Sequence, residues 1–434
     1  MSGTRQRCAS CGHELAETDA QVRCPACQGL LEILHARPAV TGAALRARFD
    51  GRRAAPRGTE GAARDSGVWR FLEAVLPTAT REIVSYPEGN TPLLENPALA
   101  RWTGLPRLLL KHEGLNPTGS FKDRGMTVAV TQARRVGATA LACASTGNTG
   151  ASLAAYASLA GLPALVLVPQ GQVALGKLSQ AIAYGARTLL VRGNFDACLA
   201  LAEQARERLG LYLLNSINPF RIEGQKTIVL ELLQQLDWTA PDWIVLPAGN
   251  LGNTAAFGKA LAEAREWGLI SDTPRLAAVQ AEGAAPFAAS FREGFARRHR
   301  VEPHTVASAI NIGNPASYDR AVRAIRETHG VVTTVPDEEI LEAKAVVDGA
   351  GVGCEPASAA SVAGARQLLR DGVIGREQRV VSVLTGHLLK DPDSVTRYHQ
   401  QADPRPPHAN PPVEIGPTLG EVERELGSRD ARPA

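Results

Sequence analysis

The sequence lacks the features of membrane-spanning proteins, of exported proteins and of DNA-binding proteins with a large overall positive charge. No apolar run in its 434 residues approaches the roughly 20 residues that cross a bilayer, and residues 1–11 are too polar to form the core of a signal peptide. Lys and Arg number 47 against 44 Asp and Glu, so the formal net charge is only +3. This small excess gives no electrostatic reason to expect nucleic acid or a membrane surface as a partner. We therefore expect a cytoplasmic protein.

The seven cysteines are an odd number and are unevenly placed, which argues against a disulfide framework. Three are scattered, whereas four form two C-x-x-C pairs that are separated by twelve residues. Two such pairs can supply four thiolates to one tetrahedral zinc ion, in a segment too short for an apolar core. Because four protein ligands leave no open coordination position, we predict a structural zinc. Its ligands would be Cys8, Cys11, Cys24 and Cys27.

Short apolar runs alternate with helix-length segments through most of the chain, which predicts an α/β fold with parallel sheet. We expect buried strands at 140–144, 164–168, 188–191, 212–214, 243–246, 276–280 and 380–384. We expect helices at 151–160, 195–209 and 254–267. Ligands of such folds bind beyond the carboxyl ends of the strands, so the loops there are candidate sites.

Two of these loops have the composition of ligand sites. After the strand at 243–246 come Gly249, Asn250, Leu251, Gly252 and Asn253, directly before a helix. Glycines let the backbone approach a ligand, and free N–H groups at a helix N-terminus favour phosphate, although a simple tight turn is the alternative. After the strand at 140–144, the polar cluster 145–150 is suited to a polar ligand or a carboxylate.

A third candidate is Lys122, which stands between a turn rich in Asn, Pro, Thr, Gly and Ser and the expected start of a helix. A lysine held there can be desolvated, as the amine of a Schiff base requires. From spacing alone, a surface charge at the end of a loop remains the alternative.

Four strings in these loops carry a resemblance to a known family. They are Asn-Pro-Thr-Gly-Ser-Phe-Lys-Asp-Arg-Gly at 116–125, Ser-Thr-Gly-Asn at 145–148, Gly-Asn-Leu-Gly-Asn at 249–253 and Thr-Gly-His-Leu-Leu-Lys-Asp-Pro at 385–392. Supporting segments are 88–93, 215–225, 308–315 and 355–361. Matching in order over about residues 69–392, the chain resembles the threonine synthases, which are pyridoxal-phosphate (PLP) enzymes of the tryptophan-synthase β-like fold, PLP fold type II.

The resemblance implies two three-layer α/β domains behind the small zinc ribbon. We expect the ribbon at 1–35 and an Arg-, Ala- and Gly-rich solvated linker at 36–67. The large PLP-binding domain would comprise 68–119 and 214–400, with the small α/β domain at 120–213. Clustered prolines predict a mobile tail at 401–434.

The resemblance also assigns roles to the cofactor-site residues. Lys122 would bind PLP as a Schiff base and later move protons, and the loop 249–253 would hold the cofactor phosphate. Asn148 would contact the 3'-oxygen of PLP, and Thr385 would place its hydroxyl at the pyridine nitrogen. Leu388 stands where we expect glycine in many relatives, which makes the role of Thr385 less secure.

The implied substrate is O-phospho-L-homoserine, which is converted with water to L-threonine and phosphate in the last step of threonine biosynthesis. A dianionic leaving group requires cations and donors in a dry site. The resemblance implies a homodimer. It implies these groups for the substrate phosphate: Ser145, Thr149, Asn215, Ser216 and Arg221.

Two alternatives remain open at this point. One is a serine/threonine dehydratase or a cysteate synthase on the same fold. A dehydratase has no phosphate to bind, which makes Arg221 an argument against it, whereas cysteate synthase also acts on a phosphorylated amino acid. The other alternative is a non-catalytic zinc-ribbon binding protein, against which the presence of Lys122, Asn148 and Thr385 argues.

Overall fold

The computed structural model describes residues 3–55, 61, 65–79, 82–171, 175–193 and 195–429. The chain divides into a unit at Met1–Asp391 and a second at Pro392–Ala434. Among the helices in the described part of the chain, none has both the length and the apolar character needed to cross a membrane.

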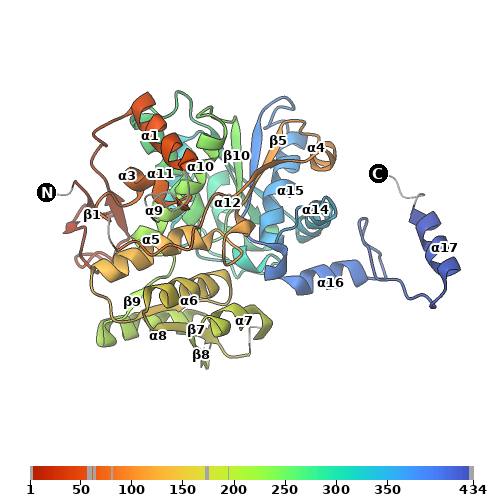
Figure 1. The fold of residues 1–434 in the computed structure, drawn as a ribbon, viewed down its shortest axis with the longest axis horizontal. Helices are drawn as coiled ribbons and strands as arrows, with labels where there is room; N and C mark the ends of the chain where they lie inside the picture. Colours follow the sequence, from red (N-terminus) through yellow and green to blue (C-terminus); the bar gives the residue numbers. More distant parts are fainter. Residues whose placement is uncertain are drawn as a thin grey trace. The chain divides into compact units, whose positions relative to one another are not determined.

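The larger of two mainly parallel sheets has six strands in the order β12-β11-β10-β13-β5-β4. Figure 1 labels its strands β10 and β5. Neighbours are parallel except β4, which runs antiparallel to β5 at one edge. The strands are β4 (Leu93–Glu95), β5 (Leu108–His112), β10 (Trp243–Pro247), β11 (Arg275–Ala281), β12 (Val331–Val335) and β13 (Val380–Leu384).

Both faces of this sheet are buried, which explains why its strands are continuously apolar. Along β10, Ile244 and Leu246 belong to one hydrophobic cluster, while Trp243 and Val245 belong to another. Helices of the second cluster are α4 (Pro97–Thr103), α14 (Asp337–Gly349) and α15 (Pro356–Arg370). Helices of the first include α5 (Lys122–Arg135), α9 (Pro219–Gln225), α10 (Thr227–Gln235), α11 (Gly252–Glu266), α12 (Pro286–Arg292) and α13 (Tyr318–Glu327).

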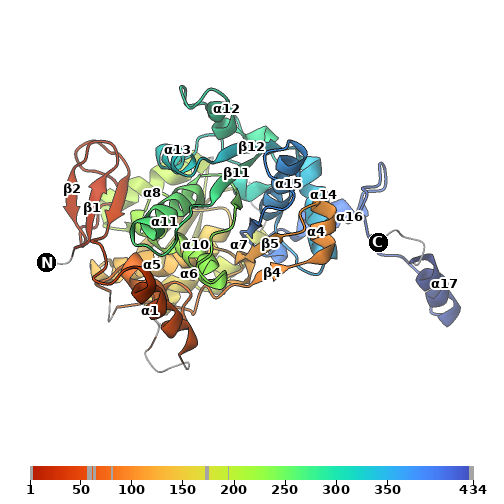
Figure 2. The same ribbon diagram turned by 90° about the horizontal axis from the view of Figure 1, so that it is seen from above.

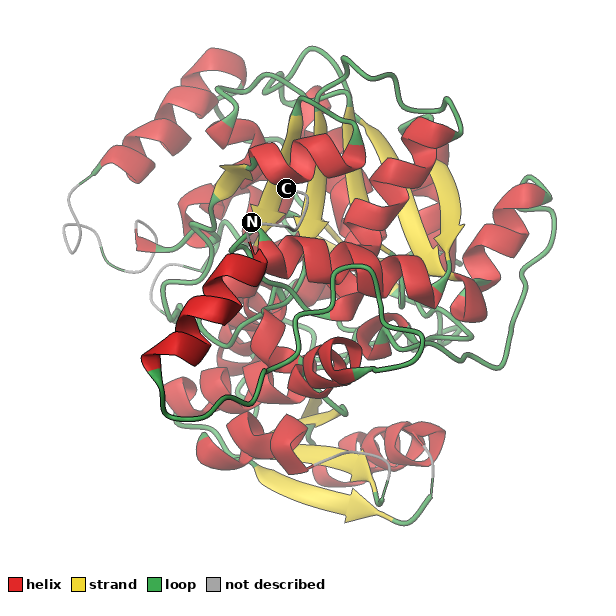
Figure 3. Cartoon of the chain, turned by 90° about the vertical axis from the view of Figure 1, so that its right-hand side faces the viewer, coloured by secondary structure: helices red, strands yellow, loops and turns green. Residues whose placement is uncertain are grey.

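The smaller sheet is entirely parallel, in the order β8-β7-β6-β9. Alternate residues of β6 again face two clusters, Leu141 and Cys143 on one side and Ala142 and Ala144 on the other. Helices therefore cover both sheets, as Figure 3 shows. The elements are β6 (Leu141–Ala144), β7 (Ala164–Pro169), β8 (Arg187–Val191), β9 (Tyr212–Leu213), α6 (Asn148–Ala160), α7 (Leu175–Ala183) and α8 (Phe195–Leu209).

The cysteine-rich N-terminus forms an antiparallel three-stranded sheet in the order β2-β1-β3 (Figure 2). Its strands are β1 (Arg5–Cys8), β2 (Glu14–Ala16) and β3 (Leu31–Leu34). Strand β3 also contacts helix α9 of the body. The ribbon is therefore joined to the part of the molecule that contains Arg221.

The prediction of a solvated linker is wrong for helix α1 (Gly42–Ala54). Its Leu45 and Phe49 lie four residues apart on one helix face, and both are fully buried in the main core. The Phe49 ring meets that of Phe71 with centroids 5.0 Å apart. Two apolar side chains at helical spacing therefore sufficed to dock this arginine-rich segment. Residues 56–60 and 62–64 of the expected linker lie outside the described residues.

The seven predicted strands and three predicted helices are confirmed within a few residues. Strands β4, β5 and β12 were not predicted. Strand β5 contains Lys111, whose charge argues against a buried strand until its ionic partner Glu231 is known.

The exact domain boundaries stay a prediction. Short elements of the first unit are α3 (Leu72–Val75) and the 3-10 helices Trp69–Phe71, Glu113–Leu115, Glu282–Ala284, Ser308–Ile310 and Leu388–Lys390.

The second unit contains two helices, α16 (Pro392–Gln400) and α17 (Leu419–Arg429). The predicted mobility of the tail at 401–434 stays a prediction, and residues 430–434 lie outside the described residues.

Candidate active site

Backbone hydrogen bonds hold the turn before Lys122 against the end of strand β13. The Phe121 N–H donates to the Thr385 carbonyl at 3.0 Å, and the His387 N–H donates to the Gly119 carbonyl at 2.9 Å. Lys122 then begins helix α5. Two motifs that lie more than 260 residues apart in sequence are thereby joined, and Lys122 is placed beside the carboxyl end of the large sheet.

The surroundings of Lys122 favour a neutral amine. The side chain is half-buried, and desolvation lowers the pKa of its amine to about 7, with a smaller contribution from the Arg221 charge and an opposing one from Glu355. Nζ lies 3.8 Å from the centroid of the Phe121 ring, and no residue in the described part of the chain hydrogen-bonds to it. A neutral, unbonded amine has the properties of a nucleophile.

Glu355 links the other two predicted cofactor residues. The Asn148 side-chain N–H donates to Glu355 Oε2 at 2.9 Å, and the Thr385 hydroxyl lies 3.4 Å from Glu355 Oε1 and 3.0 Å from Ser358 Oγ. Burial raises the pKa of Glu355 above its ordinary value. Sequence reasoning assigned no role to Glu355 or Ser358. The sequence feature that could have indicated a role for both residues is the supporting segment at 355–361, in which the carboxylate Glu355 directly precedes a proline at the start of a helix.

The loop at 249–253 forms a close backbone turn into helix α11. A Cβ at Gly249 would lie 2.9 Å from Cα of Ile310, so only glycine fits there. Leu251 has φ of +63°, a left-handed conformation that a branched side chain seldom adopts. Asn250 is engaged within the protein, since its Oδ1 accepts from the Ala316 N–H at 3.2 Å.

Two buried polar atoms at the start of α11 lack partners among the residues that the structure describes. They are Asn253 Oδ1 and the hydroxyl oxygen of Thr254. The Thr254 hydroxyl can donate to a phosphate oxygen at this helix N-terminus, whereas Asn253 Oδ1 can only accept a hydrogen bond. The hydroxyl and the helix N-terminus therefore fit a cofactor phosphate.

Arg221 is the predicted phosphate ligand with the most free donor capacity. It is buried, its Nη1 donates to the Leu214 carbonyl at 3.2 Å, and its Nε has no partner in the described part of the chain. Burial lowers the pKa of Arg221 to about 10, and its charge in turn contributes to the lowered pKa of the Lys122 amine. Arg221 and Lys122 therefore share one electrostatic environment.

Two other predicted substrate residues make contacts within the protein. The Asn215 amide accepts from the Ala144 N–H at 3.1 Å and donates to the Ala144 carbonyl at 2.9 Å. The Ser145 hydroxyl accepts from the Gly150 N–H at 3.0 Å. These bonds bring the end of strand β6 beside residue 215. Ser216 follows Asn215 directly, Thr149 lies four residues after Ser145, and both are half-buried.

The unusual Leu388 is accommodated by a glycine elsewhere. A Cβ at Gly353 would collide with Cδ2 of Leu388, so the leucine fills the space that Gly353 leaves. Gly353 also has φ of +75°, which favours glycine independently. Thr385 keeps its contacts with Glu355 and Ser358 despite the leucine.

The four N-terminal cysteines converge. Their Sγ atoms all lie within 4.8 Å of one another, with Cys8 and Cys27 3.4 Å apart and Cys11 and Cys24 3.6 Å apart. Thiolates that bind zinc at about 2.3 Å in a tetrahedron lie about 3.8 Å apart. The cluster fits a metal ion of that kind.

Known proteins share both the sequence and the fold. Residues 84–386 match the family described as "Pyridoxal-phosphate dependent enzyme". The chain is 46% identical to the threonine synthase of Methanosarcina acetivorans over 391 residues, covering 90% of this chain and 93% of the relative. It is 47% identical to the threonine synthase of Synechocystis over 332 residues, covering 75% and 84%.

Solved structures agree at the level of the fold. The structure of threonine synthase from Escherichia coli superposes with a TM-score of 0.69 at 18% identity, covering 97% of this chain and 94% of that one. Threonine deaminase isoform 2 from Solanum lycopersicum superposes with a TM-score of 0.62 at 21% identity, covering 74% and 84%. The family match and the identity to curated relatives along most of the chain lead to one conclusion: the chain belongs to the family of pyridoxal-phosphate-dependent enzymes.

Proposed function

We propose that this protein is a threonine synthase, which converts O-phospho-L-homoserine and water to L-threonine and phosphate. The observation that carries the proposal is Arg221, a buried guanidinium with a free Nε beside the Lys122 amine. A buried cation near the reacting amine is suited to a substrate with a dianionic leaving group. The curated threonine synthases that resemble the chain along most of its length support the same activity.

The residues proposed to hold PLP are Lys122 at its reactive carbon, the loop 249–253 at its phosphate, Asn148 at its 3'-oxygen and Thr385 at its ring nitrogen. PLP supplies an electron sink that stabilises negative charge on the carbons next to the substrate's amino group. A neutral hydroxyl at the ring nitrogen makes that sink weaker than a carboxylate would. Glu355 orients both contacts, because it bonds to Asn148 and Thr385.

Lys122 is proposed to move the protons. In that role Lys122 Nζ would accept the proton from Cα and, after giving that proton up, would accept one from Cβ. An amine whose pKa is about 7 can both accept and return protons near neutral pH. Arg221 and the hydroxyls of Ser145 and Thr149 hold the phosphate as the Cγ–O bond breaks.

The overall reaction balances without a further reactant. The phosphate leaves Cγ with the bonding electron pair and takes up the proton of the water, whose hydroxyl adds to Cβ. The proton lost from Cβ is matched by the one gained at Cγ, which becomes the methyl group, and Cα regains the proton it lost. Asn215 and Ser216 are proposed to position the phosphate group, with the Asn215 amide fixing the chain beside Ser145.

The decisive experiment supplies O-phospho-L-homoserine to the purified protein and follows phosphate and threonine together, with Lys122→Ala as control. Equal amounts of both products, absent in the variant, are expected. Phosphate with 2-oxobutyrate would show that water does not capture the intermediate. Activity on O-phosphoserine plus sulfite, without activity on O-phospho-L-homoserine, would assign the protein to cysteate synthesis.

A structural zinc ion on Cys8, Cys11, Cys24 and Cys27 is proposed for the ribbon, supported by the convergence of the four sulfurs. Four thiolates close the coordination sphere, so the ion stabilises the fold and takes no part in catalysis. Metal analysis should give one zinc per chain. A chelator should lower the melting temperature while the visible absorption of PLP persists.

A homodimer in the cytoplasm is proposed from the family resemblance alone. Sedimentation equilibrium of the purified holoenzyme tests the dimer, since a monomer mass at micromolar concentration would contradict it. Fractionation of cells that express the chain tests the location.

A further inference from the structure

Helices α5 and α9 approach each other backbone to backbone beside the proposed active site. The contact lies at Gly125 on α5 and Gly224 on α9. A Cβ at Gly125 would lie 3.0 Å from the Arg221 carbonyl oxygen and 3.3 Å from Arg221 Cβ. A Cβ at Gly224 would collide with the Arg124 carbonyl. A side chain at either glycine would therefore push the two helices apart.

The backbone conformation of these two glycines does not explain their presence. Neither has a positive φ, the conformation that favours glycine at other positions of this chain. Within a helix, glycine is less favourable than alanine, because it loses more conformational freedom on folding. Both glycines therefore cost stability, and the close approach of α5 and α9 is the feature that alanine would remove.

The contact lies close to the two groups that the reaction is proposed to use. On α5, Lys122 comes three residues before Gly125. On α9, Arg221 comes three residues before Gly224. Positions three residues apart share one face of a helix, so each group lies on the side of its helix that carries the contact. The charge of Arg221 lowers the pKa of Lys122, so the two groups interact electrostatically.

Hydrogen bonds to the described residues leave the Arg221 guanidinium only partly fixed. Its Nη1 donates to the Leu214 carbonyl at 3.2 Å, whereas its buried Nε has no partner in that part of the chain. Helix α9 itself is seven residues long and buried along its whole length. The place of the guanidinium therefore depends on the elements that hold α9 from either side.

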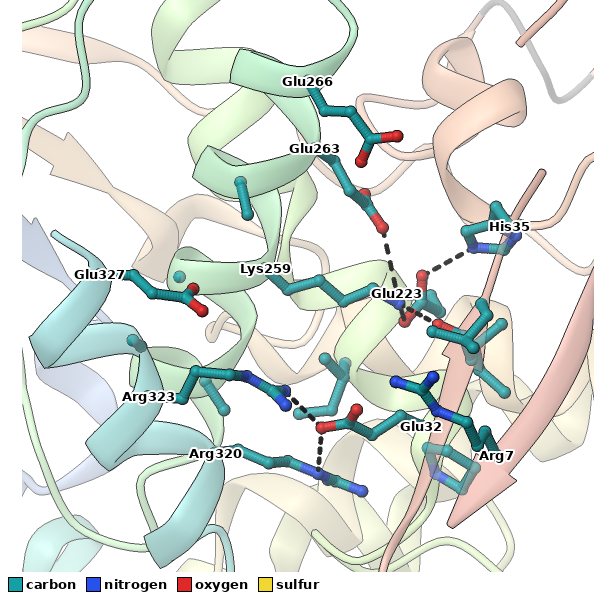
Figure 4. Close-up of a pocket in the computed structure, with 18 of the residues that line it drawn as sticks. Arg7, Glu32, His35, Glu223, Lys259, Glu263, Glu266, Arg320, Arg323 and Glu327 are labelled. Atoms are coloured by element: carbon teal, nitrogen blue, oxygen red, sulfur yellow. Dashed lines mark hydrogen bonds and ion pairs between the residues drawn. The ribbon is translucent and has the colours of Figure 1, made fainter. Parts of the chain in front are cut away.

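The ribbon holds α9 from the side opposite to α5. Glu223 on α9 is buried, and its Oε2 lies 2.8 Å from His35 Nε2 and accepts from Lys226 Nζ at 2.6 Å. Lys259 pairs with the same carboxylate and donates to the Ile33 carbonyl of strand β3 at 2.6 Å. Figure 4 shows the Glu223 carboxylate at the end of the Lys259 side chain, with its contact to His35. Helix α9 is therefore held between the ribbon and α5.

We propose that Gly125 and Gly224 position Arg221. By letting α5 touch a helix that the ribbon holds from behind, they set the spacing between the Lys122 amine and the Arg221 guanidinium. This spacing must match the distance between the amino group and the phosphate of the substrate, because a misplacement of about 1 Å can cost about 10²-fold in rate. The inference rests on the proposed function, which assigns the substrate phosphate to Arg221.

The experiment compares two ligands of the holoenzyme in Gly125→Ala. The value of kcat/KM for O-phospho-L-homoserine should fall at least about tenfold, because the added Cβ displaces Arg221. L-Threonine has no phosphate, so its affinity, measured by the visible absorption of PLP, should stay within about twofold of the wild type. The control is Gly51→Ala in helix α1, where no atom lies within 4 Å of the added Cβ, and it should change neither quantity.

Two further variants separate positioning from a general effect on the fold. In an Arg221→Ala background, Gly125→Ala should change kcat/KM by less than about twofold, because no guanidinium is left to misplace. His35→Ala loosens α9 from the ribbon side without crowding α5, and should show the same split between substrate and L-threonine with a smaller loss.

Three results would overturn the inference: equal losses for O-phospho-L-homoserine and L-threonine, a full further loss from Gly125→Ala in the Arg221→Ala background, or an unchanged kcat/KM in both Gly125→Ala and His35→Ala. The failure of the proposed function is distinguishable from these results, because the wild-type protein itself would then not turn over O-phospho-L-homoserine.

Discussion

Two lysines eleven residues apart, the buried Lys111 on β5 and the half-buried Lys122 on α5, have opposite surroundings. Nζ of Lys111 is 2.7 Å from each of three oxygens, those of Glu231, Gln235 and the Thr91 carbonyl. Nζ of Lys122 has no hydrogen-bond partner in the described part of the chain, only an aromatic face at 3.8 Å. Desolvation lowers the pKa of both amines, to about 8 for Lys111 and about 7 for Lys122.

The difference separates a lysine that stabilises the fold from one that is proposed to react with the cofactor. Lys111 belongs to a network in which Glu231 also pairs with Arg70 at 2.7 Å and Arg124 at 2.8 Å. That network joins β5, α5 and α10 behind the proposed site. Burial alone therefore does not distinguish the lysine that is proposed to react; its desolvated amine without a hydrogen-bond partner does. Each of the following experiments tests one side of this comparison.

The largest expected effect is on turnover in Lys122→Ala. Removing the amine that binds the cofactor and moves protons should lower kcat for O-phospho-L-homoserine by at least about 10³-fold. In the cofactor-free protein, stability should stay equal or rise, because the alanine avoids desolvating an unpaired amine. Lys111→Ala should show the reverse pattern, with a lower melting temperature and cofactor binding retained in the folded fraction. Similar effects of the two substitutions on kcat and on melting temperature would contradict the distinction between the two lysines.

The next effect is expected at Arg221, a buried cation with a free donor. Arg221→Lys keeps a charge but loses the fork that binds phosphate bidentately, so kcat/KM should fall by about 10²-fold. The visible absorption of bound PLP should be unchanged, since Arg221 is assigned to the substrate. Loss of PLP from the variant would instead place Arg221 at the cofactor.

On the scaffold side, Glu231→Gln should lower the free energy of unfolding by about 3–5 kcal/mol, because three buried cations lose the carboxylate between them. Urea unfolding of the cofactor-free protein measures it. The control is Glu339→Gln, which breaks a more exposed pair with Arg370 and should cost less than about 1 kcal/mol. Equal costs would mean that the buried network contributes no more than a surface pair.

The same contrast explains what could be predicted from the sequence. Strands such as β10 and β13 were predictable because burial on both faces leaves an apolar run, and Lys122 was predictable because its motif is local. Strand β5 was missed because Lys111 is neutralised by Glu231, 120 residues away. Glu355 received no role for a similar reason, since its contacts with Asn148 and Thr385 exist only after folding. Structure that depends on a local sequence pattern can be predicted from the sequence, whereas ion pairs between residues that are distant in the sequence cannot.

The smallest effect is a pH dependence that belongs to Lys122 in the cofactor-free protein. Its pKa is about 7 when folded and close to the ordinary 10.5 when unfolded, so between these values the unfolded chain binds a proton that the folded chain does not. The free energy of unfolding should therefore rise as the pH increases from about 7 to 10. In Lys122→Met this rise should be smaller, and the remainder reflects groups such as Lys111, with a pKa of about 8.

Below about pH 6 Lys122 is protonated in both the folded and the unfolded state, so it should add no slope there, and the curves of the wild type and of Lys122→Met should run parallel. Urea unfolding across this range measures both curves, and identical slopes above pH 7 would mean that the Lys122 amine is solvated like that of a surface lysine.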